Sequence, residues 1–123
     1  MKFISFQNAE AQSTEINLDG YEVTISLKDI GKRKNSVSVV MDISIDGFPD
    51  IYGIPLLPYR DLFESYINSG CMPVDFGAII VMPIDNSEIN VQNIGEGRVG
   101  IAYMNTAEVL VSSIYENTLR KYL

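Results

Sequence analysis

The chain has 123 residues, of which 46% are hydrophobic, and a net charge of −7 at neutral pH. This length is typical of one domain with its own core, and the apolar content excludes a disordered chain. Asp and Glu number 16 against 9 Lys and Arg, which excludes the basic face that sequence-specific DNA binding requires. We therefore expect a single domain, residues 1–123, that does not read nucleic-acid sequence.

The residues that most often carry catalysis are scarce. The chain has no histidine and one cysteine, Cys71, so a thiol nucleophile would lack its usual base. Asp42 and Asp46 recur on one strand face, but no oxygen-rich loop of the calcium-binding kind surrounds them. Residues 95–98 precede a strand rather than a helix, which indicates a turn and not a dinucleotide-binding loop. We expect no catalytic site, no cofactor, no metal site and no enzyme.

The N-terminal residues do not resemble a targeting signal. Residues 1–4 lead into the polar stretch 7–10 rather than into a long apolar run. No run approaches the roughly 20 apolar residues that a membrane span needs. We expect synthesis in the cytoplasm and no membrane insertion.

Residues 1–14 are predicted to form an N-terminal arm. Phe3, Ile4 and Phe6 favour a short strand, and the polar residues 7–14 favour a loop. Such an arm would suit docking on a neighbouring protein.

Two long strands are predicted from alternating apolar and polar residues, at 21–27 and 37–45. We expect them to pair as an antiparallel hairpin. Asp19 and Gly20 favour a tight turn after a short strand at 16–18, because glycine accepts a positive φ. A bulge or sharp bend is the alternative there, since the preceding strand is short.

The loop between these strands, residues 28–35, is basic. It holds four of the nine Lys and Arg residues of the chain. A solvated hairpin tip would explain the charges. The alternative is a contact with an acidic partner or with the acidic face of an adjacent subunit.

The middle of the chain combines a turn, a short strand and a short helix. A turn at 46–47 leads into a predicted edge strand at 48–53. Pro58 can open a helix over about 59–68, and Gly70 would end it.

The remaining β-structure is predicted at 78–82, which is apolar throughout, and at 99–103, with a brief alternation at 89–91 and a turn at 95–97. Together the β-rich core spans residues 15–104. We predict an α+β fold, mainly antiparallel β, barrel-like or a sandwich.

A C-terminal amphipathic helix is predicted over 106–122, with Asn105 and Glu108 in the pattern of a capping box. This helix either packs on its own domain or contacts a partner. Its apolar positions follow helical spacing: Ala107, Leu110, Val111, Ile114, Tyr115, Thr118, Leu119 and Tyr122.

Tyrosine is frequent, at seven residues, and three of them surround the Pro-Leu-Leu-Pro segment at 55–58. Tyrosine buries a large area and keeps a polar tip, which suits both interfaces and cores. The candidate interface residues combine this segment with the basic loop: Tyr52, Ile54, Leu56, Leu57, Tyr59, Tyr66, Lys32, Arg33 and Lys34.

Several of these segments resemble the small baseplate plug proteins of contractile-tailed bacteriophages, over roughly residues 15–104. This family would lead us to expect an aromatic residue, often Trp, at the opening of the second long strand, where this chain has Ser36, Val37 and Ser38. The C-terminal helix lies outside the resemblance. The segments that carry it are residues 16–25, 39–43, 45–47, 53–62 and 100–103.

The resemblance implies a structural virion protein at the tail tip, which joins or closes the tail tube at the baseplate hub and helps assembly. It implies a homo-oligomeric ring, with a hexamer favoured over a trimer, and tube, hub or spike proteins as partners. An acidic lumen would let DNA slide past. The competing hypotheses are a stand-alone cytoplasmic binding module, such as an adaptor or inhibitor, and a small ligand-binding barrel or enzyme.

Overall fold

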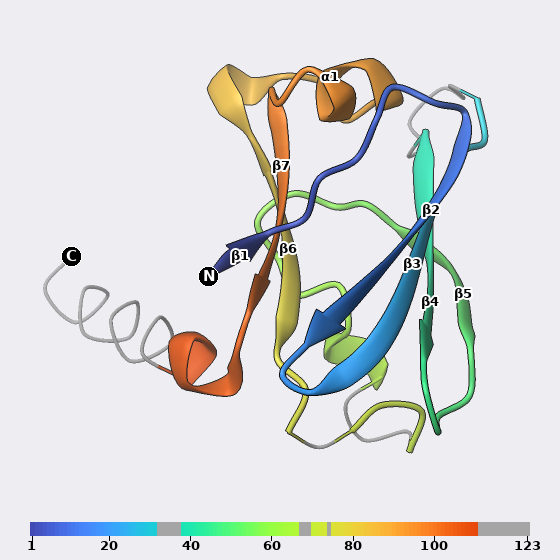
Figure 1. Ribbon diagram of the computed structural model, residues 1–123. Helices are drawn as coiled ribbons and strands as arrows, with labels where there is room; N and C mark the ends of the chain where they lie inside the picture. The colour runs from blue at the N-terminus through green and yellow to red at the C-terminus, as the bar shows by residue number, and fades with distance from the viewer. Residues whose placement is uncertain (32–37, 67–69, 74, 111–123) are drawn as a thin grey trace, which may run out of the picture.

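Two antiparallel sheets enclose one hydrophobic core in the computed structural model, which describes residues 1–31, 38–66, 70–73 and 75–110 (Figure 1). One sheet has three strands in the order β1-β7-β6, and the other has four in the order β2-β3-β4-β5. The predicted α+β class is confirmed, but the sheets do not close into a barrel. The strands are β1 (Lys2–Phe3), β2 (Ala11–Leu18), β3 (Tyr21–Asp29), β4 (Val39–Ile45), β5 (Ile51–Pro55), β6 (Ala78–Pro83) and β7 (Val99–Met104).

The turn between β2 and β3 is the predicted tight one. Asp19 and Gly20 have φ values of 53° and 86°, and Leu18 pairs directly with Tyr21 across the turn. Two consecutive residues with positive φ are typical of the turn whose twist matches an antiparallel hairpin. The alternative of a bulge or bend is therefore wrong.

Strand β2 begins earlier than the sequence indicates. Residues 11–14, predicted as loop, pair with β3, and Gln12 lies opposite Leu27. These residues are polar because β2 is the outermost strand of its sheet, so only part of each side chain is covered. Polar composition hides such a strand from a search for alternating hydrophobicity.

The predicted N-terminal arm, residues 1–14, is tied to the body of the protein. Ile4 is buried and its N–H donates to the Ile101 carbonyl at 2.8 Å. Gln7 and Gln12 exchange two hydrogen bonds, of 2.7 and 2.6 Å, between side chain and backbone. The expectation of a free docking arm therefore differs from the structure, because β1 and β2 supply strands to the two sheets.

Strand β5 starts later than predicted, at Ile51 rather than residue 48. The turn after β4 takes up residues 46–50, with Gly47 at a φ of 87° and the Phe48 N–H donating to the Ile45 carbonyl. Its edge position agrees with the prediction.

The helix predicted over 59–68 is largely wrong. Only a short 3-10 helix at Glu64–Tyr66 is present among the described residues, and residues 67–69 lie outside them. The backbone instead bonds to the edge of β6, where Tyr59 N–H donates to Val81 and Leu62 N–H to Ile79. Tyr59 has a φ of 56°, which a right-handed helix does not allow.

The alternation predicted at 89–91 runs into a short helix, α1 (Val91–Gly95), rather than a strand, and the turn predicted at 95–97 follows the end of this helix, with Gly97 at a φ of 80°. Asn90 begins it by accepting a hydrogen bond from Asn93 N–H at 2.7 Å. A helix of five residues is too short to show helical periodicity. A second 3-10 helix, at Ile84–Asn86, connects β6 to this region.

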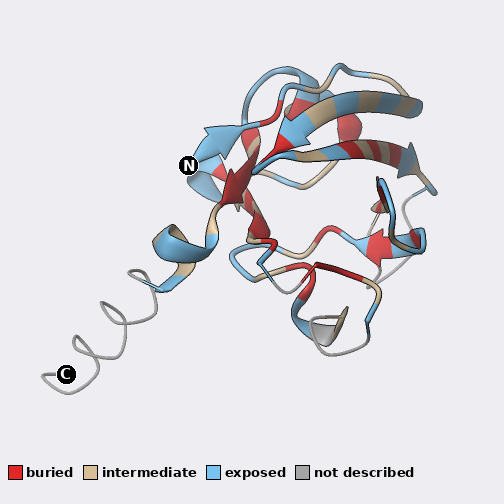
Figure 2. Ribbon diagram, turned by 60° about the horizontal axis from the view of Figure 1, so that its bottom comes forward, coloured by how far each residue is buried: buried red, intermediate tan, exposed pale blue. Residues whose placement is uncertain are grey.

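The core lies between the two sheets, and every strand except β1 contributes buried residues to it (Figure 2). Strands β3 and β4 show the predicted alternation in full. An aromatic cluster fills one end of the core. Its ring pairs have centroids 5.1–6.3 Å apart and join Tyr21, Phe48, Phe63, Phe76 and Tyr103.

The capping box at the C-terminal helix is confirmed. Asn105 Oδ1 accepts from the Glu108 N–H at 2.9 Å, and Glu108 Oε1 accepts from the Asn105 N–H at 3.2 Å. Glu108 also forms an ion pair with the Met1 amino group, and hydrogen bonding to that group lowers the pKa of Glu108. Residues 106–110 are helical, and the rest of the predicted helix, 111–122, lies outside the described residues.

Candidate interaction surfaces

The structure separates the candidate interface residues into two groups. Tyr52 and Tyr59 are 70% and 65% exposed, while Leu57 and Tyr66 are half-buried. Ile54 and Leu56 are only 2% and 1% exposed. The last two side chains belong to the core, so including them in a surface was wrong. The basic candidates Lys32, Arg33 and Lys34 lie outside the described residues.

Tyr59 forms one wall of a shallow surface hollow. Its hydroxyl donates to the Pro83 carbonyl at 2.6 Å, which fixes the ring over the edge of β6. Leu57, Ser87 and Ile89 line the same hollow, whose volume is about 450 Å³. A fixed and exposed aromatic ring beside apolar residues is typical of a protein contact rather than of catalysis.

Tyr52, in β5, has an exposed side chain that bonds to a residue two positions before it in the chain. Its hydroxyl donates to Asp50 at 2.9 Å. Hydrogen bonds from Ser44 and then Tyr52 lower the pKa of Asp50, and the bond to Asp50 raises the pKa of Tyr52. This exposed pair lies beside the β4–β5 turn and offers a polar contact surface.

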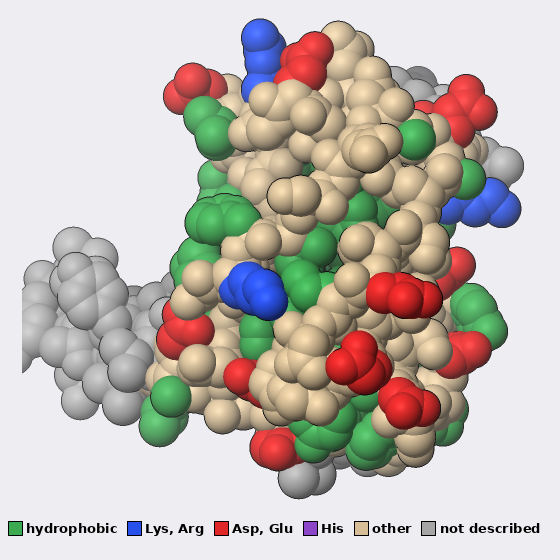
Figure 3. All heavy atoms as spheres, viewed as in Figure 1, with side chains coloured by type: hydrophobic (Ala, Val, Ile, Leu, Met, Phe, Trp, Pro, Cys, Tyr) green, Lys and Arg blue, Asp and Glu red, His purple; other side chains and the backbone are tan. Residues whose placement is uncertain are grey.

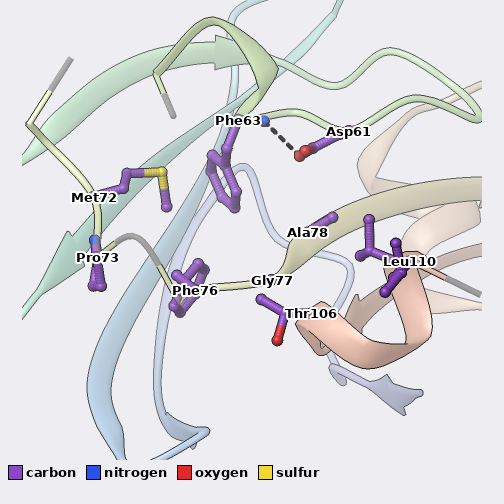
Figure 4. A pocket seen from close by; sticks show the side chains of 10 residues that line it. Asp61, Phe63, Met72, Pro73, Phe76, Gly77, Ala78, Thr106 and Leu110 are labelled. Carbon is purple, nitrogen blue, oxygen red and sulfur yellow. Dashed lines mark hydrogen bonds between the residues drawn. The ribbon is translucent and has the colours of Figure 1, made fainter. Parts of the chain in front are cut away.

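An apolar groove lies beside the start of the C-terminal helix (Figure 4). Phe63, Phe76 and Leu110 come from three separate segments and surround it, and its volume is about 320 Å³. Asp61, an acidic residue of its lining, accepts a hydrogen bond from Phe63 N–H at 2.9 Å. Burial raises the pKa of Asp61. The described lining of the groove offers mainly apolar contact.

Sequence reasoning missed this groove. Its lining comes from three stretches that are distant along the chain and come together only in the folded protein: residues 61 and 63, residues 72, 73 and 76–78, and residues 106, 109 and 110. The apolar residues that contribute to it are indistinguishable from core residues in the sequence.

The outer face of the four-stranded sheet is acidic toward the β2–β3 turn. Glu15, Glu22 and Asp46 line a shallow hollow there, with a volume of about 290 Å³. Figure 3 shows Asp and Glu side chains gathered on the lower half of the face that β2 and β3 share. Glu22 accepts a hydrogen bond from Asn17 at 3.0 Å. This part of the sheet would attract a cationic partner and repel nucleic-acid phosphates.

The described residues contain no group of three or more His, Cys, Asp or Glu side chains placed to hold a metal ion. Asp42, which the sequence pairs with Asp46, accepts a hydrogen bond from Gly53 N–H at 2.8 Å. In the part of the chain that the structure describes, no helix has the length and apolar character of a membrane span.

The chain matches a known protein family over most of its length. A family model described as cyanophage baseplate Pam3 plug gp18 matches residues 1–107. The matched range includes all seven strands and ends inside the first turn of the C-terminal helix. Among curated proteins, no sequence matches the chain significantly.

Proposed function

Since the chain belongs to the family of cyanophage baseplate plug proteins and is thus a structural baseplate component of a phage tail, we propose that it joins or closes the end of the tail tube at the baseplate hub. The predicted resemblance to phage baseplate plugs is confirmed, over a longer range than the expected 15–104. The match to residues 1–107 is the observation that carries the proposal.

The proposed partners are further copies of this chain and the tube, hub or spike proteins of the same tail. A ring of copies would follow the symmetry of the tube, with six subunits favoured over three. Exposed Tyr59 and its hollow, together with the apolar groove at Phe63 and Phe76, supply surfaces of suitable chemistry for these contacts. We propose that the protein is made in the host cytoplasm, helps the tail to assemble, and catalyses no reaction.

The acidity of the chain supports a place on the DNA path. A net charge of −7 and the acidic hollow at Glu15, Glu22 and Asp46 would keep phosphates from adhering. A wall that DNA must pass without sticking needs this property.

The proposal is tested by mass measurement in solution. The purified chain is analysed by light scattering during size exclusion, alone and mixed with the tube and hub proteins of the same phage. We expect a ring or a stable complex with one of these proteins. A monomer that binds none of these proteins would overturn the proposal and favour the hypothesis of a stand-alone binding module.

A matched pair of variants locates the contact. Tyr59→Ala removes the exposed ring beside its hollow, and we expect it to weaken the complex at least tenfold, as truncation of an interface aromatic does. Gln92→Ala, at an exposed position of α1, serves as the control and should bind as the unchanged protein does. Equal binding by both variants would exclude the Tyr59 surface.

A further inference from the structure

Strand β2 is the outermost strand of the four-stranded sheet, so one side of its backbone has no neighbouring strand among the described residues. The tight turn makes Leu18 and Tyr21 a hydrogen-bonded pair, and such pairs alternate along a hairpin. Even-numbered residues of β2 therefore bond to β3. The backbone groups that point to the free side belong to Ala11, Ser13, Glu15 and Asn17.

Two hydrogen bonds at the ends of the hairpin confirm this alternation. Asp29 N–H donates to the Glu10 carbonyl at 2.7 Å, on the side of β2 that faces β3. Asp46 N–H donates to the Glu22 carbonyl at 3.0 Å, on the side of β3 that faces away from β2.

The opposite edge of the same sheet, at β5, is protected. At this edge Pro55 has no N–H, and the N–H of Gly53 is bound to Asp42 of the neighbouring strand β4 at 2.8 Å. The pairing register also shifts between Met41 and Ile43. Prolines and bulges at an edge are the features by which proteins prevent pairing with another chain.

Strand β2 has none of these protections. Its 8 residues contain no Pro, Gly or Lys, and its register with β3 is unbroken. Within the described residues, the N-terminal segment contacts β2 at its two ends, through Gln12 and through a long 3.4 Å bond from Lys2 Nζ to the Asn17 carbonyl. The backbone groups at Ser13 and Glu15 stay open to a further strand.

The charges beside this edge select the kind of strand. Glu15, Glu22 and Asp46 lie together on the outer face next to it. A second copy would place its own Glu15 beside this acidic group, and like charges across a strand pair are unfavourable. A strand with Lys or Arg at alternate positions would pair with it instead.

We infer that the free edge of β2 accepts an extended basic segment of another protein, which adds a fifth strand to the four-stranded sheet. Main-chain hydrogen bonds to Ser13 and Glu15 hold the segment, and its Lys or Arg side chains face Glu15 and Glu22. This inference is independent of whether the protein closes the tail tube, because it rests on the edge and its charge.

The test uses the full-length chain and a synthetic peptide of alternating Lys and Val, as long as the 8-residue β2. Amide exchange is followed by NMR. In the free protein, the amides of Ser13 and Glu15 should exchange faster than those of Thr14 and Ile16. The Lys-Val peptide should slow the amide exchange of Ser13 and Glu15, and an alternating Glu-Val peptide should leave it unchanged.

Variants separate the edge from the charge. Ser13→Pro removes an outward N–H and should weaken peptide binding about tenfold or more, whereas Ser13→Ala should bind as the unchanged protein. The double variant Glu15→Gln with Glu22→Gln should weaken the binding of the Lys-Val peptide and reduce the salt dependence of that binding. This second variant tests the proposal if Ser13→Pro fails to fold.

Several results would overturn the inference. One is a Lys-Val peptide that leaves the exchange of Ser13 and Glu15 unchanged. Another is equal protection by the Glu-Val peptide. If these amides are already slow in the free protein and light scattering gives a dimer, the occupant is a second copy and not a basic segment of another protein.

Discussion

The hydroxyl of Tyr103 donates a hydrogen bond to the carboxylate of Asp19 at 2.6 Å, across 84 positions of sequence. Tyr103 belongs to β7 in the three-stranded sheet, and Asp19 to the turn that joins β2 and β3 in the other. The same hydroxyl accepts from Gly77 N–H at 2.9 Å. One buried side chain thus links both sheets and the start of β6.

Removal of this hydroxyl should destabilise the protein. In Tyr103→Phe, Asp19 loses a donor and the Gly77 N–H loses its acceptor, so we expect the free energy of unfolding to fall by about 1–3 kcal/mol. Urea denaturation followed by circular dichroism measures the change. Tyr52→Phe, at a 70% exposed position, is the control and should change stability by less than about 0.5 kcal/mol. Equal stability of both variants would contradict the linking role of Tyr103.

Tyr103 should also make the folded protein less stable in alkali. Burial, followed by the hydrogen bond to Asp19, raises the pKa of Tyr103 in the folded protein above the value of about 10 for an exposed tyrosine. A raised folded pKa gives stability that is complete below pH 10 and declines as the pH rises toward the folded pKa. The free energy of unfolding of Tyr103→Phe should decline less steeply above about pH 10 than that of the unchanged protein. If the free energy of unfolding declined equally with pH in both proteins, the role of Tyr103 in this decline would be refuted.

Gly77 should not tolerate a side chain. A Cβ at this position would overlap the Met104 carbonyl and lie 2.9 Å from the Asn105 Cα, both of which are backbone atoms and cannot rotate away. We expect Gly77→Ala to lower the free energy of unfolding by about 3 kcal/mol or more, measured by urea denaturation. In the control Gly100→Ala, the nearest atom is Cε1 of the Phe3 side chain at 3.2 Å, so the ring can shift. Similar stability of the two variants would be inconsistent with this contact.

Loss of the helix cap should affect the C-terminal end. Asn105→Ala removes the oxygen that accepts from Glu108 N–H, and N-cap replacements of this kind cost about 1 kcal/mol. Thermal unfolding should show a lower midpoint, while Thr106→Ala, which leaves both capping bonds intact, should show little change. A larger effect of Thr106→Ala would exclude Asn105 as the cap.

Strands with apolar residues along one face could be predicted from the sequence, and the polar first half of the edge strand β2 could not. Alternation located β3 and β4 because Val23, Ile25 and Leu27 face the core on one side and polar residues face solvent on the other. Residues 11–14 carry too few apolar side chains to reveal a strand, because no further strand covers their outer side. The segment 59–62 has helical composition but bonds to β6, which is a tertiary preference that spacing cannot show.

The candidate interaction surface could be predicted from the sequence only in part. Tyr52 and Tyr59 are exposed as an interface requires. The prediction also includes Ile54 and Leu56, because they lie in or next to the segment that the tyrosines surround, but Leu56 N–H donates to the Val39 carbonyl at 3.2 Å and both side chains are buried. Hydrophobicity alone does not distinguish a contact surface from the core.

The unequal edges of the four-stranded sheet limit how far strand addition can proceed. A filament that grows by strand pairing needs a template on both sides of every subunit. Here Pro55 and the bond between Gly53 and Asp42 close one side, so a strand that pairs with β2 cannot be passed on through β5. Each copy would then bind one added strand and could not pair with a further one through β5. Strand addition would therefore give an assembly of fixed stoichiometry and not a fibre.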